Sequence, residues 1–296
     1  MEQQHAREFV PEPSSVILHA GDSICVRDVH CRGCQREISA EECPGTTRIV
    51  FPYRGAFVRH LGMRQAVADV NQVLFFNAGE AYRVSHPVNG GDRCVSIGLA
   101  ESLLEELCGD LAHSTSGPLR MRIAQRSVEP GLHLEVSRLR LVDRDQPLEL
   151  QGRTLAVVAT ALAGCRPLPR VTPAARRLIR RAKLLLHAAP ARRWSLVDLA
   201  RELAASPVYL TQLFTRVEGM PLYRYQTRLR LARAMSALSE ATDLATLAAD
   251  HGFSSHSQLT FAFRRVYGVA PSILRTQFRR GRAPLDFRIA RSPRLS

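Results

Sequence analysis

Four cysteines and a histidine crowd into one stretch near the N-terminus, SICVRDVHCRGCQREISAEECPG. Cys25, Cys31, Cys34, Cys43 and His30 fall within 19 residues. The CxxC spacing of Cys31 and Cys34 lets two thiolates converge on one soft metal ion such as zinc. Cys43, together with Cys25 or His30, would complete a tetrahedral ligand set. A second CxxC, which would make the pattern specific, does not follow.

Two other interpretations of this cluster stay open. Cys31 and Cys34 would sense oxidants or electrophiles by forming a disulfide, or the cysteines are buried structural thiols that bind nothing. Cys94, Cys108 and Cys165 lie in strand or helix patterns and are expected in the core. The N-terminus lacks the pattern of a signal peptide, so we expect a cytosolic chain with reduced thiols. No cofactor is expected to be required; zinc or another soft metal is the candidate.

The cluster lies among short segments that are typical of strands. They are rich in β-branched and aromatic residues and are separated by turn residues: SVILHA, SICVRDV, RIVFPY, GAFVRHL, RQAVADV, VLFFNAG, AYRVSHP and CVSIGLA. This regular spacing predicts a barrel or sandwich. From Leu99 the apolar residues recur at helical spacing, which predicts two or three helices. CRPLPRVTP, with three prolines in nine residues, is typical of a linker.

Positive charge is concentrated after this linker. Residues 1–169 carry 18 basic and 20 acidic side chains, a balance of −2. Residues 170–296 carry 23 and 7, a balance of +16. Clustered cations displace counterions from a phosphate backbone, so we expect the C-terminal part to bind a polyanion. A solvated basic surface is the alternative.

The basic part repeats a pair of apolar helix faces. In the first copy, a helix opened by Ser195 and Asp198 in a capping-box pattern precedes the turn AASP. The second helix then carries apolar residues at Leu210, Leu213, Phe214 and Val217, which recur 49 residues later as Leu259, Ala262, Phe263 and Val266. The closing glycines, Gly219 and Gly268, also differ by 49.

Two helices joined by a tight turn form a helix-turn-helix, whose second helix can enter a major groove. An ordinary helical packing unit explains a single copy equally well. Two copies in the basic segment, joined by the helix PLYRYQTRLRLARAMSALSEA, favour DNA binding. We expect the joining helix to fix the two units relative to each other by burying Leu222, Tyr225, Leu229, Ala232, Met235 and Leu238.

The segment LATLAADHGFSSHSQLTFAFRRVYGVAPSILR resembles the signature of AraC/XylS-type transcription regulators. The resemblance rests on Ala248, Gly252-Phe253-Ser254, Phe263, Gly268 and Pro271, within residues 172–275. It implies two helix-turn-helix units that read successive major-groove turns on one DNA face, and RNA polymerase as a partner. The first half more loosely resembles the cupin-like sensing domain that many members carry, followed by helices used for dimerisation.

By the family pattern, the outward N-terminal part of each second helix reads base edges. The candidates are Val208, Thr211 and Gln212 in the first unit and His256, Ser257, Gln258 and Phe261 in the second. Gln258 suits an adenine edge, whereas Phe261 can only touch a thymine methyl or stack. Phe261 departs from several relatives, and the alternative is that it packs against Tyr267 or the tail. Better placed for phosphates are Tyr209, Arg216, Ser254, Arg264 and Arg265.

Motifs of an enzyme are not found in the sequence. Metal-dependent cupin enzymes need an HxH pair with a further Glu and His, yet neither His60 nor His86 has a histidine two residues away. GxSxG, HExxH and P-loop motifs are missing as well. The N-terminal half is therefore expected to bind a ligand, with the barrel interior as the default pocket.

The expected fold class is α+β, with a cupin-like β-barrel, helices after it, and an all-α double helix-turn-helix domain. The expected divisions are a sensing barrel at 1–100, a helical dimerisation or linking segment at 101–166, a linker at 167–172, the DNA-binding domain at 173–276 and a basic tail at 277–296. Two apolar stripes would either pair two chains in a homodimer or cap the barrel: Leu132, Val136, Leu139, Leu155, Val158 and Leu162.

The sequence thus predicts a transcription regulator that binds double-stranded DNA specifically. A small molecule or metal bound in the N-terminal half would shift the population of domain arrangements. The alternatives are a non-sensing architectural DNA binder and a cupin enzyme fused to a DNA-binding domain. No membrane partner is expected, because the most apolar helical stretch, TLAVVATALAGC, is too short to span a bilayer.

Overall fold

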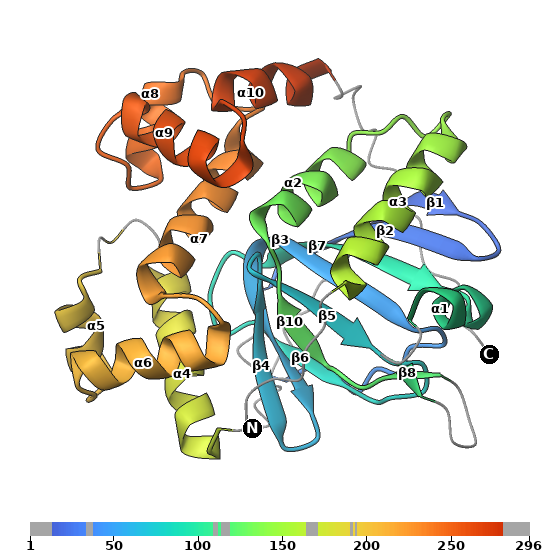
Figure 1. The fold of residues 1–296 in the computed structure, drawn as a ribbon, viewed down its shortest axis with the longest axis horizontal. Coiled ribbons are helices and arrows are strands. Elements are labelled where there is room, and N and C mark those ends of the chain that lie inside the picture. The colour runs from blue at the N-terminus through green and yellow to red at the C-terminus, as the bar shows by residue number, and fades with distance from the viewer. Residues whose placement is uncertain are drawn as a thin grey trace, which may run out of the picture.

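The computed structural model describes residues 14–33, 38–108, 112–113, 119–163, 171–189, 192 and 194–280. Strands and three helices fill the N-terminal half, and helices alone build the C-terminal part (Figure 1). This confirms the expected combination of an N-terminal sheet with C-terminal helices.

One antiparallel sheet contains most strands. Its hydrogen-bonded order is β1-β2-β7-β3-β5-β10, and β4 and β6 also pair with β3. The strands are β1 (Ser14–Ala20), β2 (Ile24–Cys31), β3 (Arg48–Leu61), β4 (Arg64–Asp69), β5 (Gln72–Phe76), β6 (Arg83–Ser85), β7 (Asp92–Leu99) and β10 (Gln125–Ser127). A separate pair is formed by β8 (Ala112–His113) and β9 (Arg120–Met121).

β3 is a single strand where the sequence pattern suggested two. Its first half pairs with β5 and β7, and its second half pairs with β4 and β6. The register with β7 slips between Pro52 and Arg54, which leaves Tyr53 as an extra residue. Such a bulge bends a strand and interrupts the ladder of hydrogen bonds. Proline is tolerated there because its missing N–H then costs no ladder hydrogen bond. The bend lets β3 contribute to two layers of the sheet.

The sheet does not close into the expected cupin-like barrel. Among the described residues, the ladder runs from β1 to β10, and these two end strands are not paired with each other. The space between the layers is not an empty pocket either, because side chains fill it: Val50, Phe57, Ala68, Leu74, Phe76 and Cys94. Two shallow hollows lie elsewhere, and Val70, Val128 and His133 line both. One lies between the sheet and α2, and the other is closed on one side by Arg228 and Tyr267 of the C-terminal helices.

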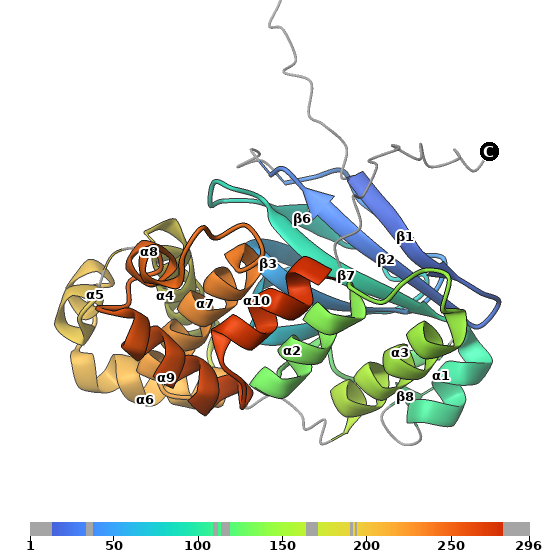
Figure 2. The same cartoon turned by 90° about the horizontal axis from the view of Figure 1, so that it is seen from above.

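Three helices cover the other face of the sheet: α1 (Glu101–Cys108), α2 (Pro130–Leu139) and α3 (Pro147–Leu162). Figure 2 shows them together on one side of the strands. The alternation of β3 points Ile49 and Phe51 toward these helices, where they join one apolar core. The same core takes up the two apolar stripes for which the sequence left open a dimer interface or a cap on the sheet. Leu132, Val136, Leu139, Val158 and Leu162 are at most 4% exposed and Leu155 packs against them, so these stripes cap the sheet.

Seven helices in the described residues form the C-terminal part: α4 (Pro173–Ala188), α5 (Leu196–Glu202), α6 (Pro207–Glu218), α7 (Leu222–Ala237), α8 (Leu244–Asp250), α9 (His256–Tyr267) and α10 (Pro271–Arg280). α10 thus extends into the segment expected to be a basic tail. Within the described residues, none of these or the other helices is both long and apolar enough to cross a membrane.

α7 is the central helix of this part. One side packs into the core of the first unit through Tyr225, Leu229 and Ala232. The other side packs into the core of the second unit through Leu231, Ala234 and Met235. The predicted role of this helix in joining the units agrees with this packing, although Leu222 is only partly buried.

Candidate DNA-binding face and its contact with the sheet

α6 and α9 are the same structural element used twice. Their first and last residues, 207 and 218 against 256 and 267, differ by 49. The hydroxyl of Ser206 accepts from the Tyr209 N–H at 3.2 Å, and that of Ser255 accepts from the Gln258 N–H at 3.1 Å. Left-handed glycines with φ of 70° and 73° end the two helices. The 49-residue repeat of the sequence is therefore a repeat of the backbone.

The helices before them repeat with a spacing of 48. Ser195 caps α5 by accepting from the Asp198 N–H at 3.1 Å, and Asp243 caps α8. In each turn a left-handed residue follows: Ala204 with φ of 52° and Gly252 with φ of 78°. The second turn is one residue longer, which accounts for the change of spacing from 48 to 49. Each unit is a helix-turn-helix.

Most candidate base readers point to solvent. Val208 is 67% exposed and Phe261 is 66% exposed; Gln212, His256, Ser257 and Gln258 are exposed as well. Thr211 is only half-buried, and its hydroxyl donates to the Pro207 carbonyl at 2.9 Å. On the opposite side of the two helices, Leu210, Phe214, Leu259 and Phe263 are fully buried.

Two candidate base readers of α9, Phe261 and Gln258, differ in the contacts they make. Tyr267, the suggested packing partner of Phe261, is buried against Phe263 and His133 instead, while Phe261 stays exposed. The other possible partner, the tail from residue 281 onward, lies outside the described residues. The amide oxygen of Gln258 accepts from the backbone N–H of Ser254 at 2.6 Å, so reading an adenine edge requires this side chain to turn away from the tight turn.

The residues assigned to phosphates are also on the surface: Tyr209, Arg216, Ser254, Arg264 and Arg265. The helix repeat relates them in pairs. Arg216 and Arg265 occupy equivalent positions near the ends of α6 and α9, whereas Tyr209 occupies the position of Gln258. By this register Tyr209 lies in the first turn of its helix, beside the candidate base readers.

Comparison with known proteins gives the type of this domain. Residues 199–277 match a family model described as a helix-turn-helix domain. A Streptomyces lividans protein described as an AraC-like transcription regulator is 39% identical over 87 residues, which cover 29% of each chain. Residues 199–277 form an AraC-type helix-turn-helix domain. The HTH-type transcriptional regulator YidL of Escherichia coli K12 is 33% identical over 98 residues, 33% of each chain. The matches thus span about a third of these relatives.

This chain is also similar to proteins of known structure. ToxT from Vibrio cholerae has 14% sequence identity and a TM-score of 0.33, over 86% of this chain and 99% of that one. The C-terminal domain of AraT, a response regulator from Geobacillus stearothermophilus, has 24% identity and a TM-score of 0.33, over 40% of this chain and 93% of that one.

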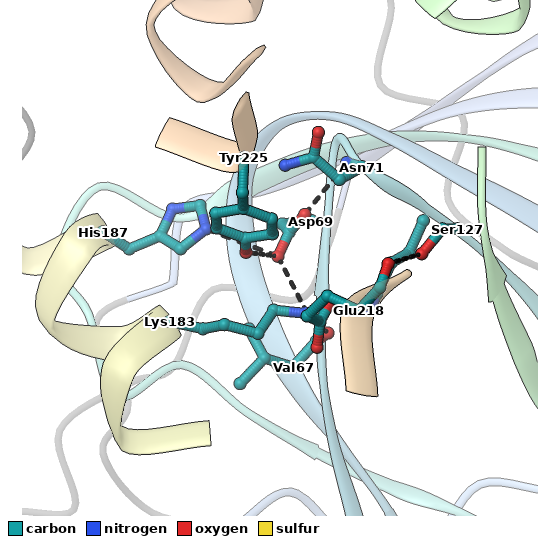
Figure 3. A network of polar contacts seen from close by, with 9 residues as sticks. Val67, Asp69, Asn71, Ser127, Lys183, His187, Glu218 and Tyr225 are labelled. Atoms are coloured by element: carbon teal, nitrogen blue, oxygen red, sulfur yellow. Dashed lines mark hydrogen bonds and ion pairs between the residues drawn. The ribbon is translucent and has the colours of Figure 1, made fainter. Parts of the chain in front are cut away.

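A buried polar network joins the C-terminal helices to the sheet (Figure 3). At its centre lies Lys183 of α4, the one lysine of the sequence. Its ammonium group is 3.2 Å from Asp69 at the end of β4, 3.2 Å from Glu218 of α6, and donates to the Val67 carbonyl at 3.1 Å. The hydroxyl of Tyr225 also donates to Asp69. The sequence pattern had marked only Tyr225, as a buried residue of the joining helix, because the others meet only in the folded chain.

The network is built for a charged pair. Burial alone would raise the pKa of Asp69, but the charge of Lys183 holds it well below its usual range. Burial alone would likewise lower the pKa of Lys183, but Asp69 and Glu218 raise it. Burial raises the pKa of Glu218 and lowers that of the neighbouring His187. The pair therefore stays ionised at neutral pH while the histidine is neutral.

Two further contacts cross the same boundary. Arg228 of α7 donates to the Val128 carbonyl at 2.9 Å and to the Glu129 carboxylate at 3.1 Å, just before α2. His133 of α2 lies 3.2 Å from the hydroxyl of Tyr267 at the end of α9. Both helix-turn-helix units are thus held by the N-terminal half, the first through Lys183 and the second through His133.

The structure separates the cysteine cluster. Side chains alternate along β2, so His30 points toward the helices, where it lies 3.1 Å from the hydroxyl of Tyr53, while Cys31 points to the opposite face. Cys25 lies six residues back, about 20 Å along the strand. Cys43 is exposed, and Cys34 lies outside the described residues. Cys25, His30 and Cys43 therefore do not form the ligand set expected with Cys31.

Cys31 instead meets two residues that the sequence analysis did not assign. They are His86, which it treated as an isolated histidine, and Asp92. The two lie on either side of the turn PVNGG, and this pairing of a histidine and an aspartate across a glycine turn was the available signal. Burial alone would lower the pKa of His86, but hydrogen bonds to Asp92 and Cys31 raise it to about 10.

Proposed function

We propose that this protein is a transcription regulator that binds double-stranded DNA in a sequence-dependent way through α6 and α9. The observation that supports this most is the exact backbone repeat of a capped helix with an exposed first turn and an arginine near its end. Such a helix fits the major groove, its first turn facing base edges and its arginine facing phosphates. The balance of +16 after residue 169 supplies the attraction to DNA.

We propose further that the N-terminal half controls the placement of the two units. The network around Lys183 and the contact of His133 with Tyr267 support this, because each ties one unit to the sheet side. A signal that changes the sheet would change the free energy of these contacts and so shift the population of domain arrangements. Because DNA is the proposed target, we assign the protein to the cytosol.

Dimerisation and contact with RNA polymerase, which the family resemblance implies, complete the proposal. The exposed side of α3 is the surface we assign to a second copy, since Leu148 there is 82% exposed and Gly152, Ala156 and Ala159 are exposed small residues. Sedimentation of the full chain at micromolar concentration, with Leu148→Glu for comparison, tests this part. A monomer at all concentrations contradicts it.

The DNA-binding function is tested by selecting bound sequences from a pool of random duplexes with the purified full chain. We expect enrichment of one motif with two half-sites, about one helical turn apart, one for each unit. An architectural DNA binder would retain the pool without enrichment and with a steep salt dependence. Failure to retain duplex DNA at low salt would contradict the proposal as a whole.

A further inference from the structure

Cys31, His86 and Asp92 converge at one corner of the sheet. Cys31 ends β2 and stands directly opposite Asp92, the first residue of β7, in the antiparallel ladder. His86 follows β6. The thiol sulfur, one ring nitrogen and one carboxylate oxygen all lie within 4.8 Å of one another, and no other group of three or more such ligands does so within the described parts of the chain. His86 and Asp92 are 8% and 5% exposed, whereas Cys31 is half-buried.

The backbone approaches these side chains closely at two glycines. A Cβ on Gly91, whose φ is +64°, would lie 2.0 Å from the Cys31 carbonyl oxygen. A Cβ on Gly33, whose φ is +31°, would lie 2.9 Å from the ring of His86. The two glycines therefore let the strand ends close over the histidine. The ring is held in place on another side by Phe57, at 6.3 Å between ring centroids.

We propose that Cys31, His86 and Asp92 bind one divalent zinc-class ion. The set offers sulfur, nitrogen and oxygen, which together suit Zn²⁺ better than the oxygen-seeking Mg²⁺ and Ca²⁺. Three protein ligands leave a fourth tetrahedral position for water or another small ligand. The half-buried sulfur provides the side from which an ion enters.

The binding requires one local movement. Nε2 of His86 and Oδ1 of Asp92 are 2.6 Å apart, a hydrogen-bond distance. Two ligands of one tetrahedral zinc ion are roughly 3.5 Å apart. The pair therefore separates by about 1 Å when an ion replaces the shared proton. A His–Asp ion pair alone would explain two of the three residues, whereas an ion bound here would also use the Cys31 sulfur, which lies within reach of both.

This site deepens the function proposed above, because an ion bound here would be the signal that the N-terminal half receives. The binding of the ion does not itself depend on that function. Asp92 and Gly91 pack against β3 at Gly55, and β3 also contacts α7 through the Tyr53 carbonyl, which accepts from Ser236 at 3.3 Å. A displacement of Asp92, at the start of β7, can therefore be transmitted through β3 to α7, the central helix of the AraC-type domain.

Titration with Co²⁺ tests the site, because thiolate-bound cobalt gives a near-ultraviolet charge-transfer band and visible bands whose intensity reports tetrahedral geometry. The full chain is stripped with a chelator, kept reduced with a non-thiol reductant and titrated. We expect about one equivalent of Co²⁺ bound with a thiolate band, and its displacement by Zn²⁺. Cys31→Ser should remove the band and weaken binding by at least about 100-fold, and Asp92→Asn should weaken it about 10- to 100-fold.

Cys43→Ser is the matched control, because Cys43 is an exposed cysteine outside the group, and it should bind Co²⁺ as the unsubstituted chain does. Cys31 is half-buried, so Cys31→Ser decides the matter even if Asp92→Asn fails to fold; circular dichroism verifies its fold. No uptake, or equal uptake by Cys31→Ser, would overturn the site. Metal binding with unchanged affinity for the selected DNA would leave the site standing and remove its role as the signal. Loss of DNA binding by the metal-free and the metal-loaded chain alike would contradict only the proposed function.

Discussion

Nζ of Lys183 lies 3.2 Å from Oδ2 of Asp69, across the boundary between the C-terminal helices and the sheet. The lysine is 2% exposed and the aspartate is fully buried. Three groups surround the ammonium group of Lys183: it donates to Glu218 and to the Val67 carbonyl and forms an ion pair with Asp69. Two of these groups belong to β4 and one to α6, so the ammonium group holds two parts of the chain together.

Lys183→Met should destabilise the protein by about 3 to 5 kcal/mol, because it leaves the Asp69 carboxylate buried without its cation. Denaturant unfolding of the full chain measures the loss. The double variant Asp69→Asn, Lys183→Met should lose less than the sum of the two single variants, because the uncompensated charge is then gone. Additive losses would mean that the two groups do not stabilise each other.

The single lysine also reports directly on the boundary. An amine-reactive reagent can modify Lys183 only when this contact opens, and peptide mass spectrometry separates that product from modification of the N-terminal amine. We expect slow modification in the free protein and faster modification in Asp69→Asn, which weakens the contact. Modification of Lys183 at the rate of an exposed lysine would contradict the buried network.

Acidification should loosen the contact of α2 with α9. Burial, together with the nearby charge of Arg140, lowers the pKa of His133 to about 4, against an ordinary value of 6.5. The unfolded chain therefore binds this proton more readily than the folded chain, so stability is lost as the pH falls from about 6.5 to about 4. Between pH 7 and pH 5 the loss from this one group is about 2 kcal/mol.

His133→Gln is the variant that isolates this effect, since glutamine keeps a polar group near Tyr267 but cannot be protonated. Between pH 7 and pH 5 the free energy of unfolding should fall in both proteins, but by about 2 kcal/mol less in His133→Gln than in the unsubstituted chain. Because other groups titrate in both proteins, the difference between the two curves is the measurement. Parallel curves would show that His133 is not buried in its neutral form.

The AraC-type helix-turn-helix domain could be predicted from the sequence because its information is local. Ser206 and Ser255 cap helices three residues before the N–H groups they bind, and apolar residues return at helical spacing, so composition and pattern suffice. The strands were found for the same reason. The continuity of β3 was missed because Pro52 and Gly55, ordinary signals of a turn, here mark a bulge in an unbroken strand.

The remaining features depend on contacts far apart in the chain. Asp69 and Lys183 are 114 residues apart in the sequence, and no periodicity links them. His86 and Cys31 come together because β2 and β6 end at the same corner, which only the strand order determines. The stripes of α2 and α3 were apolar as expected, but an apolar stripe does not say whether it meets a sheet or a second chain, and here it meets the sheet.

Substitutions of base-contacting residues should weaken binding only to the selected DNA sequence, whereas substitutions of phosphate-contacting residues should weaken binding to any DNA. Gln258→Ala and Gln212→Ala should each weaken binding to the selected DNA by about 1 to 3 kcal/mol and leave binding to random DNA nearly unchanged. Arg265→Ala should weaken both and flatten the dependence of affinity on salt. Ser254→Ala is the control for the contact between Gln258 and the turn. Equal losses of Gln258→Ala on both DNAs would remove this residue from the reading face.

The two turns offer a matched pair of substitutions. Ala204 and Gly252 occupy the same place in the two units, with φ of 52° and 78°. An alanine in the left-handed region costs roughly 1 to 2 kcal/mol of stability. Replacing it with glycine removes this strain, but glycine loses more conformational freedom on folding, which offsets part of the benefit. Ala204→Gly should therefore stabilise the protein by about 0.5 to 1 kcal/mol.

Gly252→Ala should do the opposite, with a loss of about 1 to 2 kcal/mol, and the new Cβ would also lie 3.3 Å from Nε of Arg230. Thermal unfolding of both variants measures the pair, and opposite shifts are the expected result. Because the two positions are structurally equivalent, shifts of the same sign would mean that the turns of the two helix-turn-helix units do not share one backbone conformation.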